Sequence, residues 1–220
     1  MRDIDQTNFK FNFDKNYKQE DFFVSKSNKE IFELLNCWPK WERNCLNISG
    51  EKFSGKTHLI NIFLKKFGGI KFDASSLIDE DLNEIKSNKN IVIENLDIEI
   101  NENLIFTIMN IIDQENKFLI ISSLKPIVEL KFKLNDLQSR SKNFLLHNIN
   151  KPDDELIYAL ILKNLSDRQI SIEKKLINYA INRISRSYSK IFEFIYKIDE
   201  ISLKKNKSID LKIIKEVLGE

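Results

Sequence analysis

The sequence predicts an α/β fold with a five-stranded parallel sheet, followed by a small all-helical region. Short apolar strands alternate with helical stretches through much of the chain, which is typical of a parallel sheet with helices on both faces. Residues 50–57, GEKFSGKT, fulfil every fixed position of the phosphate-binding P-loop pattern G-x-x-x-x-G-K-S/T. After Pro152 the apolar residues recur with a helical period only. We expect an extended tail at 1–20, an α/β nucleotide-binding domain at 21–150 and a helical lid domain at 151–220.

The elements before residue 150 follow from apolar runs and from the turn residues between them. A capping box at Ser27–Glu30 predicts a helix through Leu35, which Trp38-Pro39 ends. Gly68-Gly69 stops the helix after the P-loop. The predicted strands are 45–49, 70–73, 91–94, 118–122 and 144–147, and the predicted helices between them are 58–64, 79–85 and 102–115.

The region after residue 150 reads as a helical bundle. Pro152 breaks the chain, and Asp153 can cap the helix that follows. The predicted helices are 154–165, 173–184, 189–204 and 209–218, with Ser171, Ser187 and Ser208 near the starts of the last three.

Composition excludes several classes of protein. The chain has 220 residues, of which 42% are hydrophobic and 31% charged, so it can bury a substantial core. No apolar run approaches the roughly 18 residues that cross a bilayer, and the polar start carries no secretion signal, so we expect a cytoplasmic protein without membrane contact. The net charge of +2 gives no overall footprint for nucleic acid, and Cys37 and Cys45 lack metal-ligand spacing.

The P-loop predicts a nucleotide site. Two of the five glycines, Gly50 and Gly55, stand where the backbone must turn and present N–H groups to phosphate oxygens. Lys56 would bridge the β- and γ-phosphates of ADP or ATP, and the Thr57 hydroxyl would bind Mg²⁺. A strand before the loop and a helix after it supply the context that the pattern requires.

A second acidic element should end another strand of the sheet. Glu94 ends the strand at 91–94, where a carboxylate can hold Mg²⁺, although it could equally be a strand-end carboxylate in solvent. Asn95 stands where many ATPases place the acid that polarises the attacking water, and an amide can orient water but cannot take its proton. We therefore expect nucleotide binding with weak intrinsic hydrolysis.

Two further polar residues, one at the end of a strand and one just before a strand, are candidates for the site. Ser122 ends the strand at 118–122 and is placed to touch the γ-phosphate or the attacking water, or it is a plain turn residue. Arg140 comes just before the last strand, where multi-subunit ATPases place an arginine that reaches a neighbour's site. The alternative for Arg140 is a solvated surface charge.

The residues together resemble a known family. The stretch GEKFSGKTHL at 50–59, the pair Ser27-Asn28 and the stretch LQSR at 137–140 are similar to the AAA+ module of the bacterial replication initiator DnaA. The chain is closer still to the Hda-type regulatory inactivators of DnaA, especially the HdaA form. That likeness covers nearly the whole chain and rests on the stretches 23–28, 38–41, 152–154, 167–169 and 186–188.

The resemblance implies an AAA+ base, a helical lid and bound ADP, in a protein that joins the DNA-loaded sliding clamp and stimulates hydrolysis of DnaA-bound ATP. It implies that Arg140 acts in trans on DnaA, and that Arg186, which is otherwise a surface charge, senses nucleotide. The family's nucleotide contacts would be Gly50, Ser54, Gly55, Lys56, Thr57, His58 and Ser122.

Two departures from the initiator pattern bear on activity. The initiator's acidic pair is Glu94-Asn95 here, and its strand-end sensor acid corresponds to Leu124, so autonomous ATP turnover should be weak. The sequence ends at Glu220 directly after the expected lid, so we expect no sequence-specific DNA-binding domain of the helix-turn-helix type.

The tail carries a second candidate motif. Gln6, Phe9 and Phe11 resemble the clamp-binding pattern Q-x-x-L-x-F, with Phe9 at the Leu position. Alternate residues of an extended strand point to one side, so both rings could enter one groove while the Gln6 amide fixes the register. Alternatively, these rings fold back on the α/β domain.

Two other functions remain open from the sequence. The chain could be a nucleotide-dependent adaptor, such as a helicase loader, which docks partners without affecting hydrolysis. A P-loop kinase for a small molecule is a third alternative, but the helical region shows no arginine cluster for phosphoryl transfer. The sequence leaves the oligomeric state open, a homodimer included.

Overall fold

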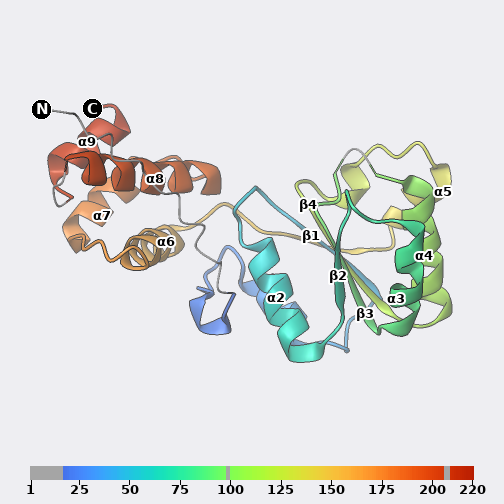
Figure 1. Cartoon of the computed structure of the whole chain (residues 1–220). Coiled ribbons are helices and arrows are strands. Elements are labelled where there is room, and N and C mark those ends of the chain that lie inside the picture. The colour runs from blue at the N-terminus through green and yellow to red at the C-terminus, as the bar shows by residue number, and fades with distance from the viewer. Residues whose placement is uncertain (1–16, 98–99, 206–208) are drawn as a thin grey trace, which may run out of the picture.

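The computed structural model describes residues 17–97, 100–205 and 209–220. A parallel five-stranded sheet forms its centre, in the order β2-β3-β4-β1-β5 (Figure 1). The strands are β1 (Cys45–Ser49), β2 (Ile70–Asp73), β3 (Asn90–Glu94), β4 (Phe118–Ser123) and β5 (Leu145–Asn148). The predicted fold class is therefore confirmed. Because all five strands run in the same direction, the residues that follow β1, β3 and β4 meet at one edge of the sheet.

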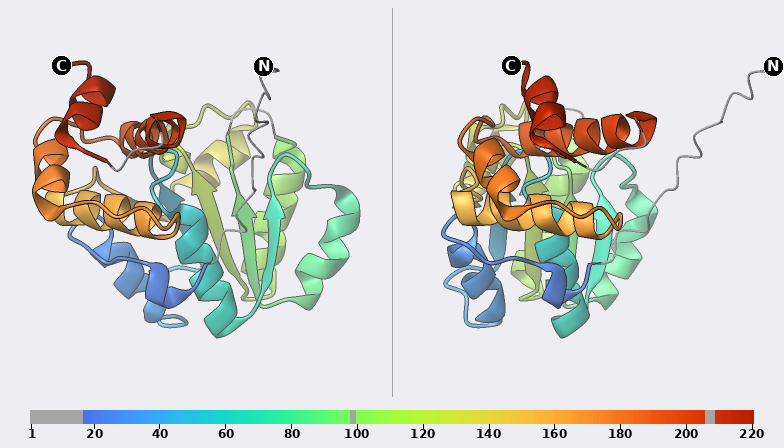
Figure 2. Two further views of the ribbon diagram at one scale, coloured as in Figure 1. Left: turned by 60° about the vertical axis from the view of Figure 1, so that its left-hand side comes forward. Right: turned by 90° about the vertical axis from the view of Figure 1, so that its left-hand side faces the viewer.

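Helices cover both faces of the sheet (Figures 1 and 2). One face packs against α1 (Lys29–Asn36) and α2 (Lys56–Phe67), and the other packs against α3 (Leu82–Ser87), α4 (Glu102–Gln114) and α5 (Asn135–Ser141). Strand β3 shows why both faces are apolar: Val92 joins the cluster that includes residues of α1 and α2, while Ile91 and Ile93 join the cluster on the α4 side. Short 3-10 turns lie at Gln19–Asp21, Asp79–Asp81 and Ile127–Glu129.

The predicted capping box at Ser27–Glu30 is wrong. Helix α1 begins at Lys29, and its N-cap residue Asn28 makes no side-chain capping bond. The Asn28 amide instead accepts a hydrogen bond from Ser25 N (2.9 Å) and donates one to Phe23 O (3.0 Å). These two bonds stabilise the segment before α1. Because they use the Asn28 side chain, it cannot also cap the helix.

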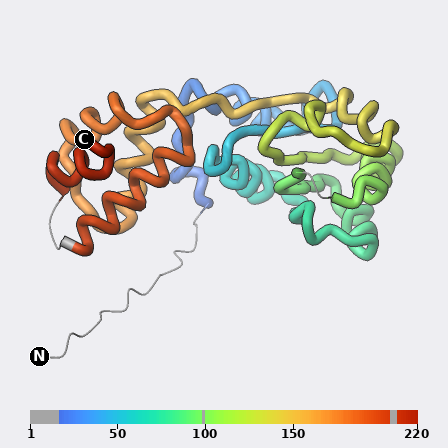
Figure 3. Tube along the Cα trace, turned by 90° about the horizontal axis from the view of Figure 1, so that it is seen from above, coloured from blue at the N-terminus to red at the C-terminus, as the bar shows by residue number. Residues whose placement is uncertain are grey.

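In the described part of the chain after β5, four helices pack around a hydrophobic cluster of their own: α6 (Asp154–Ser166), α7 (Lys174–Ile181), α8 (Tyr188–Lys205) and α9 (Leu211–Leu218). Figure 3 shows this bundle at one end of the molecule and the sheet at the other. Asp153 caps α6 through Leu156 N (2.8 Å), as predicted, and Asp210 caps α9 through Ile213 N (2.8 Å). Ser208 lies outside the described residues.

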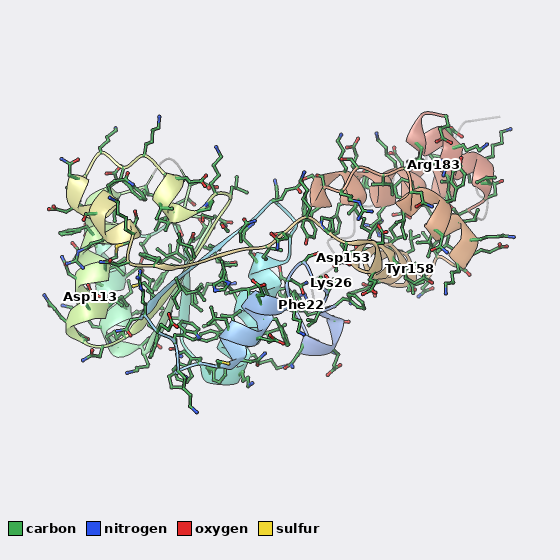
Figure 4. The ribbon with its side chains drawn as sticks, turned by 180° about the vertical axis from the view of Figure 1, so that it is seen from behind. Phe22, Lys26, Asp113, Asp153, Tyr158 and Arg183 are labelled. Atoms are coloured by element: carbon green, nitrogen blue, oxygen red, sulfur yellow. The ribbon has the colours of Figure 1, made fainter. Side chains whose placement is uncertain are left out.

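Polar contacts hold the bundle against the sheet domain. Ser27 Oγ donates to Asp153 Oδ2 (3.0 Å), and Lys163 Nζ lies 2.5 Å from Asp21 Oδ1. Figure 4 shows Phe22 and Lys26 beside Asp153, so the segment before α1 lies at the junction of the two parts. Within the described residues, no helix is long and apolar enough to cross a membrane.

Candidate nucleotide-binding site

The P-loop lies where the sequence predicts it, between the end of β1 and the start of α2. Gly55 is the N-cap of α2 and has φ of +95°, a left-handed conformation that disfavours side chains. A Cβ atom at Gly50 would lie 3.0 Å from Ser54 Oγ and 3.2 Å from Ile149 Cβ. Both glycines are therefore required by the shape of the loop.

The Lys56 side chain curls back over the loop. Its Nζ donates to Gly50 O (2.7 Å) and to Glu51 O (3.0 Å). Burial lowers the pKa of Lys56 from its ordinary value, and the negative charges of Asp97 and Glu94 oppose that shift. The ammonium thus sits in a partly dry site with carboxylates nearby, where a phosphate oxygen would be a strong partner.

Two buried oxygen atoms in the site could each be completed by a ligand: the Ser54 hydroxyl can donate to a phosphate oxygen, and the Glu94 carboxylate can accept from a water or bind a cation. Ser54 Oγ and Glu94 Oε1 are buried and make no hydrogen bond within the part of the chain that the structure describes. An unpaired buried polar atom is costly unless a ligand or water completes it. Together with the Lys56 ammonium, these atoms make the P-loop fit a nucleotide.

Glu94 ends β3 on the same face of the sheet as Val92, which packs toward α2. Its Oε2 lies 3.1 Å from Lys71 Nζ, and its side chain is only 9% exposed. Sequence reasoning missed Lys71, although strand alternation and the register of β2 with β3 place Lys71 on the face that Glu94 occupies.

Asn95 and Ser122 come together at the ends of β3 and β4. Asn95 has φ of +59°, its N–H donates to Ser122 Oγ (3.2 Å), and its side-chain Nδ2 donates to Asp73 Oδ2 (2.6 Å). Hydrogen bonds from Ser75 and Asn95 hold the pKa of Asp73 below its ordinary value. The Asn95 amide therefore points to the end of β2 in this structure.

Asp97 and Leu124 follow the same two strands. Leu124 N donates to Asp97 Oδ1 (3.4 Å), and the Leu124 side chain is half exposed. Sequence reasoning did not single out Asp97, yet its charge acts on Lys56. Its position three residues after the strand-end carboxylate Glu94 is a signal that could have identified it.

His58 lies in an aromatic group beside the first turn of α2. Its Nε2 is 2.7 Å from Lys18 O, and its ring packs edge-on against Phe22 and Tyr17. Thr57, the predicted metal ligand, lies in the same turn, and its carbonyl accepts a hydrogen bond from Asn61 Nδ2 (2.7 Å). The described residues contain no cluster of three metal-ligating side chains.

Glu51, the second residue of the P-loop, connects the loop to the helical bundle. Its carboxylate accepts hydrogen bonds from Ser187 Oγ, from Tyr188 N (3.0 Å) and from Ser189 N (3.1 Å) at the start of α8. Burial acts to raise the pKa of Glu51, but these hydrogen bonds hold it below its ordinary value. No local pattern signals this contact, because it joins residues more than 130 positions apart.

Each of the two predicted arginines pairs with an aspartate outside the P-loop. Arg186 stands two residues before α8, and its Nη2 lies 2.8 Å from Asp154 Oδ1 in an exposed ion pair. Arg140 lies in the last turn of α5, with Nη1 2.5 Å from Asp113 Oδ2. Figure 4 shows Asp113 on α4, at the end of the molecule opposite α6–α9.

The strand order, the P-loop after β1 and the helical bundle after β5 define an AAA+ fold of the P-loop NTPase class. The structure is similar to domain III of the replication initiation protein DnaA from Thermotoga maritima, with a TM-score of 0.76 and 18% identity over 93% of this chain and 96% of that one. DnaA from Aquifex aeolicus, solved with AMPPCP, gives a TM-score of 0.67 at 22% identity and covers 86% of this chain and 69% of that one. The RuvB motor of Thermotoga maritima gives 0.69 at 13% identity, over 93% of this chain and 72% of that one.

Sequence comparison points the same way. DnaA from Borreliella afzelii is 24% identical over 240 residues, which cover 97% of this chain and 50% of that protein. An uncharacterized protein of Haemophilus influenzae is 26% identical over 188 residues, with 78% of this chain and 80% of that protein covered. No family model matches. The chain has an AAA+ fold and is similar in sequence to DnaA proteins, and it spans about half the length of the DnaA proteins it matches.

Proposed function

We propose that this chain binds ADP or ATP at Gly50–Thr57 and regulates replication initiation by acting on DnaA, in the manner of the Hda-type proteins. The observation that carries the proposal is the complete P-loop between β1 and α2 of a DnaA-like fold. A DnaA of the same fold has been solved with the nucleotide analogue AMPPCP, which supports an adenine nucleotide at this loop.

The proposed roles at the site follow from position and chemistry. The loop N–H groups and Lys56 bind the phosphates, and Ser54 Oγ completes the cradle. His58 and its aromatic neighbours would contact the bound nucleotide. Ser122 and Arg186 are the other residues proposed to contact it. Thr57 and Glu94 are the proposed ligands for Mg²⁺ when it accompanies the nucleotide. The nucleotide supplies the phosphoanhydride bond that hydrolysis would cleave.

Intrinsic hydrolysis should be slow. Asn95 lies where a general base would act, and its amide cannot accept a proton from water. Its Nδ2 also donates to Asp73 at the end of β2, whereas Lys56 bonds to carbonyl groups of the P-loop. The site is therefore suited to holding a nucleotide rather than to turning it over.

Arg140 is the proposed group that acts on DnaA. Its guanidinium lies over the Phe106 ring (5.1 Å) and is about one third exposed, on a surface formed by α4 and α5. A partner docked on that surface could receive Arg140 at its own γ-phosphate, where a planar guanidinium stabilises the developing charge. Asp113 must then release Arg140, since both anions use the same N–H donors.

Docking on the sliding clamp is proposed for Gln6, Phe9 and Phe11. These residues lie outside the described residues, so the proposal rests on their spacing alone. A clamp-bound tail would raise the local concentration of Arg140 near DnaA on the same DNA.

The test is ADP formation from DnaA–ATP in the presence of clamp-loaded DNA and this protein. Arg140→Ala should lose the stimulation, which is about 10³-fold or more where such arginines act. Arg183→Ala, at the bundle end of the molecule (Figure 4), removes the same charge and should stimulate like wild type. Full stimulation by Arg140→Ala would exclude the trans role of Arg140.

One observation favours a second function. In this structure the Arg140 guanidinium is paired with Asp113. Such a pair is expected if Arg140 only stabilises the surface formed by α4 and α5. The chain would then be a nucleotide-dependent adaptor, such as a helicase loader, that docks partners without affecting hydrolysis. In the same assay the adaptor would bind DnaA or another partner and leave the rate of ADP formation unchanged.

A further inference from the structure

A lysine lies beside the proposed metal-binding corner of the nucleotide site. Lys71 Nζ is 3.1 Å from Glu94 Oε2 and 3.4 Å from Asn61 Oδ1. Asn61 in turn donates through Nδ2 to the carbonyl of Thr57 (2.7 Å). The ammonium of Lys71 therefore bridges Glu94 on β3 and the helix turn that carries Thr57, the two residues proposed to bind Mg²⁺.

The sheet register fixes this placement. Lys71 pairs with Val92, and Asp73 pairs with Glu94, in the parallel register of β2 and β3. Val92 packs in the cluster on the α2 side, so Glu94, two residues further on, faces the same side. Lys71 faces that side as well, because Phe72 next to it packs in the opposite cluster.

The ion pair between Lys71 and Glu94 is partly buried, which strengthens the interaction between the two charges. The Glu94 side chain is 9% exposed and the Lys71 side chain 34% exposed, so the carboxylate is largely removed from water. A buried carboxylate requires a counter-charge, and Lys71 supplies it here. A divalent cation at the same corner would come next to the Lys71 ammonium, in addition to the Lys56 ammonium in the loop, and like charges at short range repel.

We infer that Lys71 is an intrinsic cation of the nucleotide site, and that ADP binding at the P-loop does not require a divalent metal. The inference rests on the proposed nucleotide function and concerns how charge is balanced there. In the usual arrangement a metal ion balances both the strand-end carboxylate and the phosphates. Here Lys71 neutralises Glu94, so that the carboxylate no longer repels the phosphates that Lys56 binds.

The experiment measures the affinity for ADP by isothermal titration calorimetry, in Mg²⁺ and in EDTA. The ADP affinity of the wild-type protein should differ by less than about twofold between Mg²⁺ and EDTA. Lys71→Met should lose at least about tenfold in EDTA, or about 1.4 kcal/mol, because Glu94 is left uncompensated beside the phosphates. Adding Mg²⁺ should restore most of that loss.

A matched control is Lys65→Met. Lys65 is exposed in the last turn of α2, nine residues and thus about 14 Å along the helix from Lys56. The substitution also removes one positive charge, and it does so on the face of the sheet that α2 covers, which Lys71 also faces. Its ADP affinity should match wild type in both Mg²⁺ and EDTA.

A second variant guards against misfolding of Lys71→Met, since removing one partner of a buried pair is destabilising. The double variant Lys71→Met/Glu94→Gln removes both charges and keeps the shape of the carboxylate. It should bind ADP equally in Mg²⁺ and in EDTA. Thermal unfolding with and without ADP checks that each variant is folded.

Two results would overturn the inference, and a third would refute the proposed function on which it rests. Wild type that needs Mg²⁺ for ADP binding would refute it while leaving the nucleotide site intact. Unchanged ADP affinity of folded Lys71→Met in EDTA would show that Lys71 has no such role. Wild type that binds ADP in neither condition would instead refute the proposed nucleotide function itself.

Discussion

Lys56 shows how much one side chain contributes at this site. Its ammonium is partly buried, bonds two loop carbonyls and has carboxylates nearby. Exchange of those carbonyls for phosphate oxygens replaces neutral acceptors with charged ones. Charge-assisted hydrogen bonds are the stronger kind, at about 1.5–3 kcal/mol each.

We therefore predict that Lys56→Ala lowers the affinity for ADP by about 100-fold, which corresponds to about 3 kcal/mol. Calorimetry or fluorescent ADP displacement measures the change. Lys52→Ala is the matched control, because Lys52 is an exposed lysine of the same loop whose ammonium lies over the Phe53 ring. If both variants bind ADP as wild type does, the loop is not the nucleotide site.

Single residues also show where reading the sequence succeeds. The position of the P-loop between a strand and a helix was predictable because the pattern is local. Lys71 and Glu51 were not identified, because their partners Glu94 and Ser187 come from elements that only the tertiary fold brings close. Asn95 was assigned to the nucleotide, and its bond to Asp73 became visible only in the structure.

Helix α8 begins against the P-loop. The Glu51 carboxylate accepts two backbone N–H groups and one hydroxyl there, at a helix end whose N–H groups favour anions. The pKa of Glu51 lies below its ordinary value of 4.5 in the folded protein. A carboxylate of that kind stabilises the fold above its unfolded pKa, and the contribution is lost as the pH falls through the folded pKa.

Glu51→Gln should therefore destabilise the protein at pH 7 by about 1 kcal/mol and have less effect near pH 4. Chemical unfolding at the two pH values measures the difference. Glu193→Gln, an exposed carboxylate further along α8, is the control and should cost little at pH 7. An equal loss at both pH values for Glu51→Gln would contradict the role of its charge.

Helices α4 and α5 form the surface that presents Arg140. The Arg140–Asp113 pair is partly exposed, and exposed ion pairs contribute about 0–1 kcal/mol. Under the proposed function, Asp113→Asn should raise the stimulation of DnaA by up to about fivefold, because Arg140 is released at lower cost. The assay with DnaA–ATP and clamp-loaded DNA measures it.

Asp136→Asn in the first turn of α5 removes the same charge nearby and should not raise the stimulation. A decrease with Asp113→Asn would mean that Asp113 orients Arg140 for its partner rather than competing for it.

Whole elements were predictable to different degrees. The five strands and the long helices follow from strong apolar periodicity, so their positions agree with the structure within a few residues. Helix α5 was not predicted, since its seven residues contain a single buried large apolar side chain, Leu137, and give no clear period. The capping box failed because Ser27 bonds across to Asp153, a long-range partner.

At the scale of the whole molecule, the tail should tether the protein to its site of action. We predict that Phe9→Ala/Phe11→Ala abolishes capture by the sliding clamp, because two aromatic rings supply most of the apolar contact in such a groove. Gln6→Ala should weaken capture through loss of one amide hydrogen bond. A clamp pull-down measures both.

Phe13→Ala is the matched control, since Phe13 continues the alternation outside the pattern. ADP binding checks that each variant is folded. Undiminished capture of the double phenylalanine variant would remove the tail from the mechanism.

Arg140 and the P-loop use different surfaces of the molecule. Arg140 pairs with Asp113 at the end away from the bundle (Figure 4), whereas the loop contacts α8 through Glu51. A two-fold pair must match one surface to itself, while two unlike surfaces can only join head to tail. Under the proposed function the Arg140 surface and the nucleotide loop are unlike, so a contact that joins one to the other is head to tail and gives the assembly a direction.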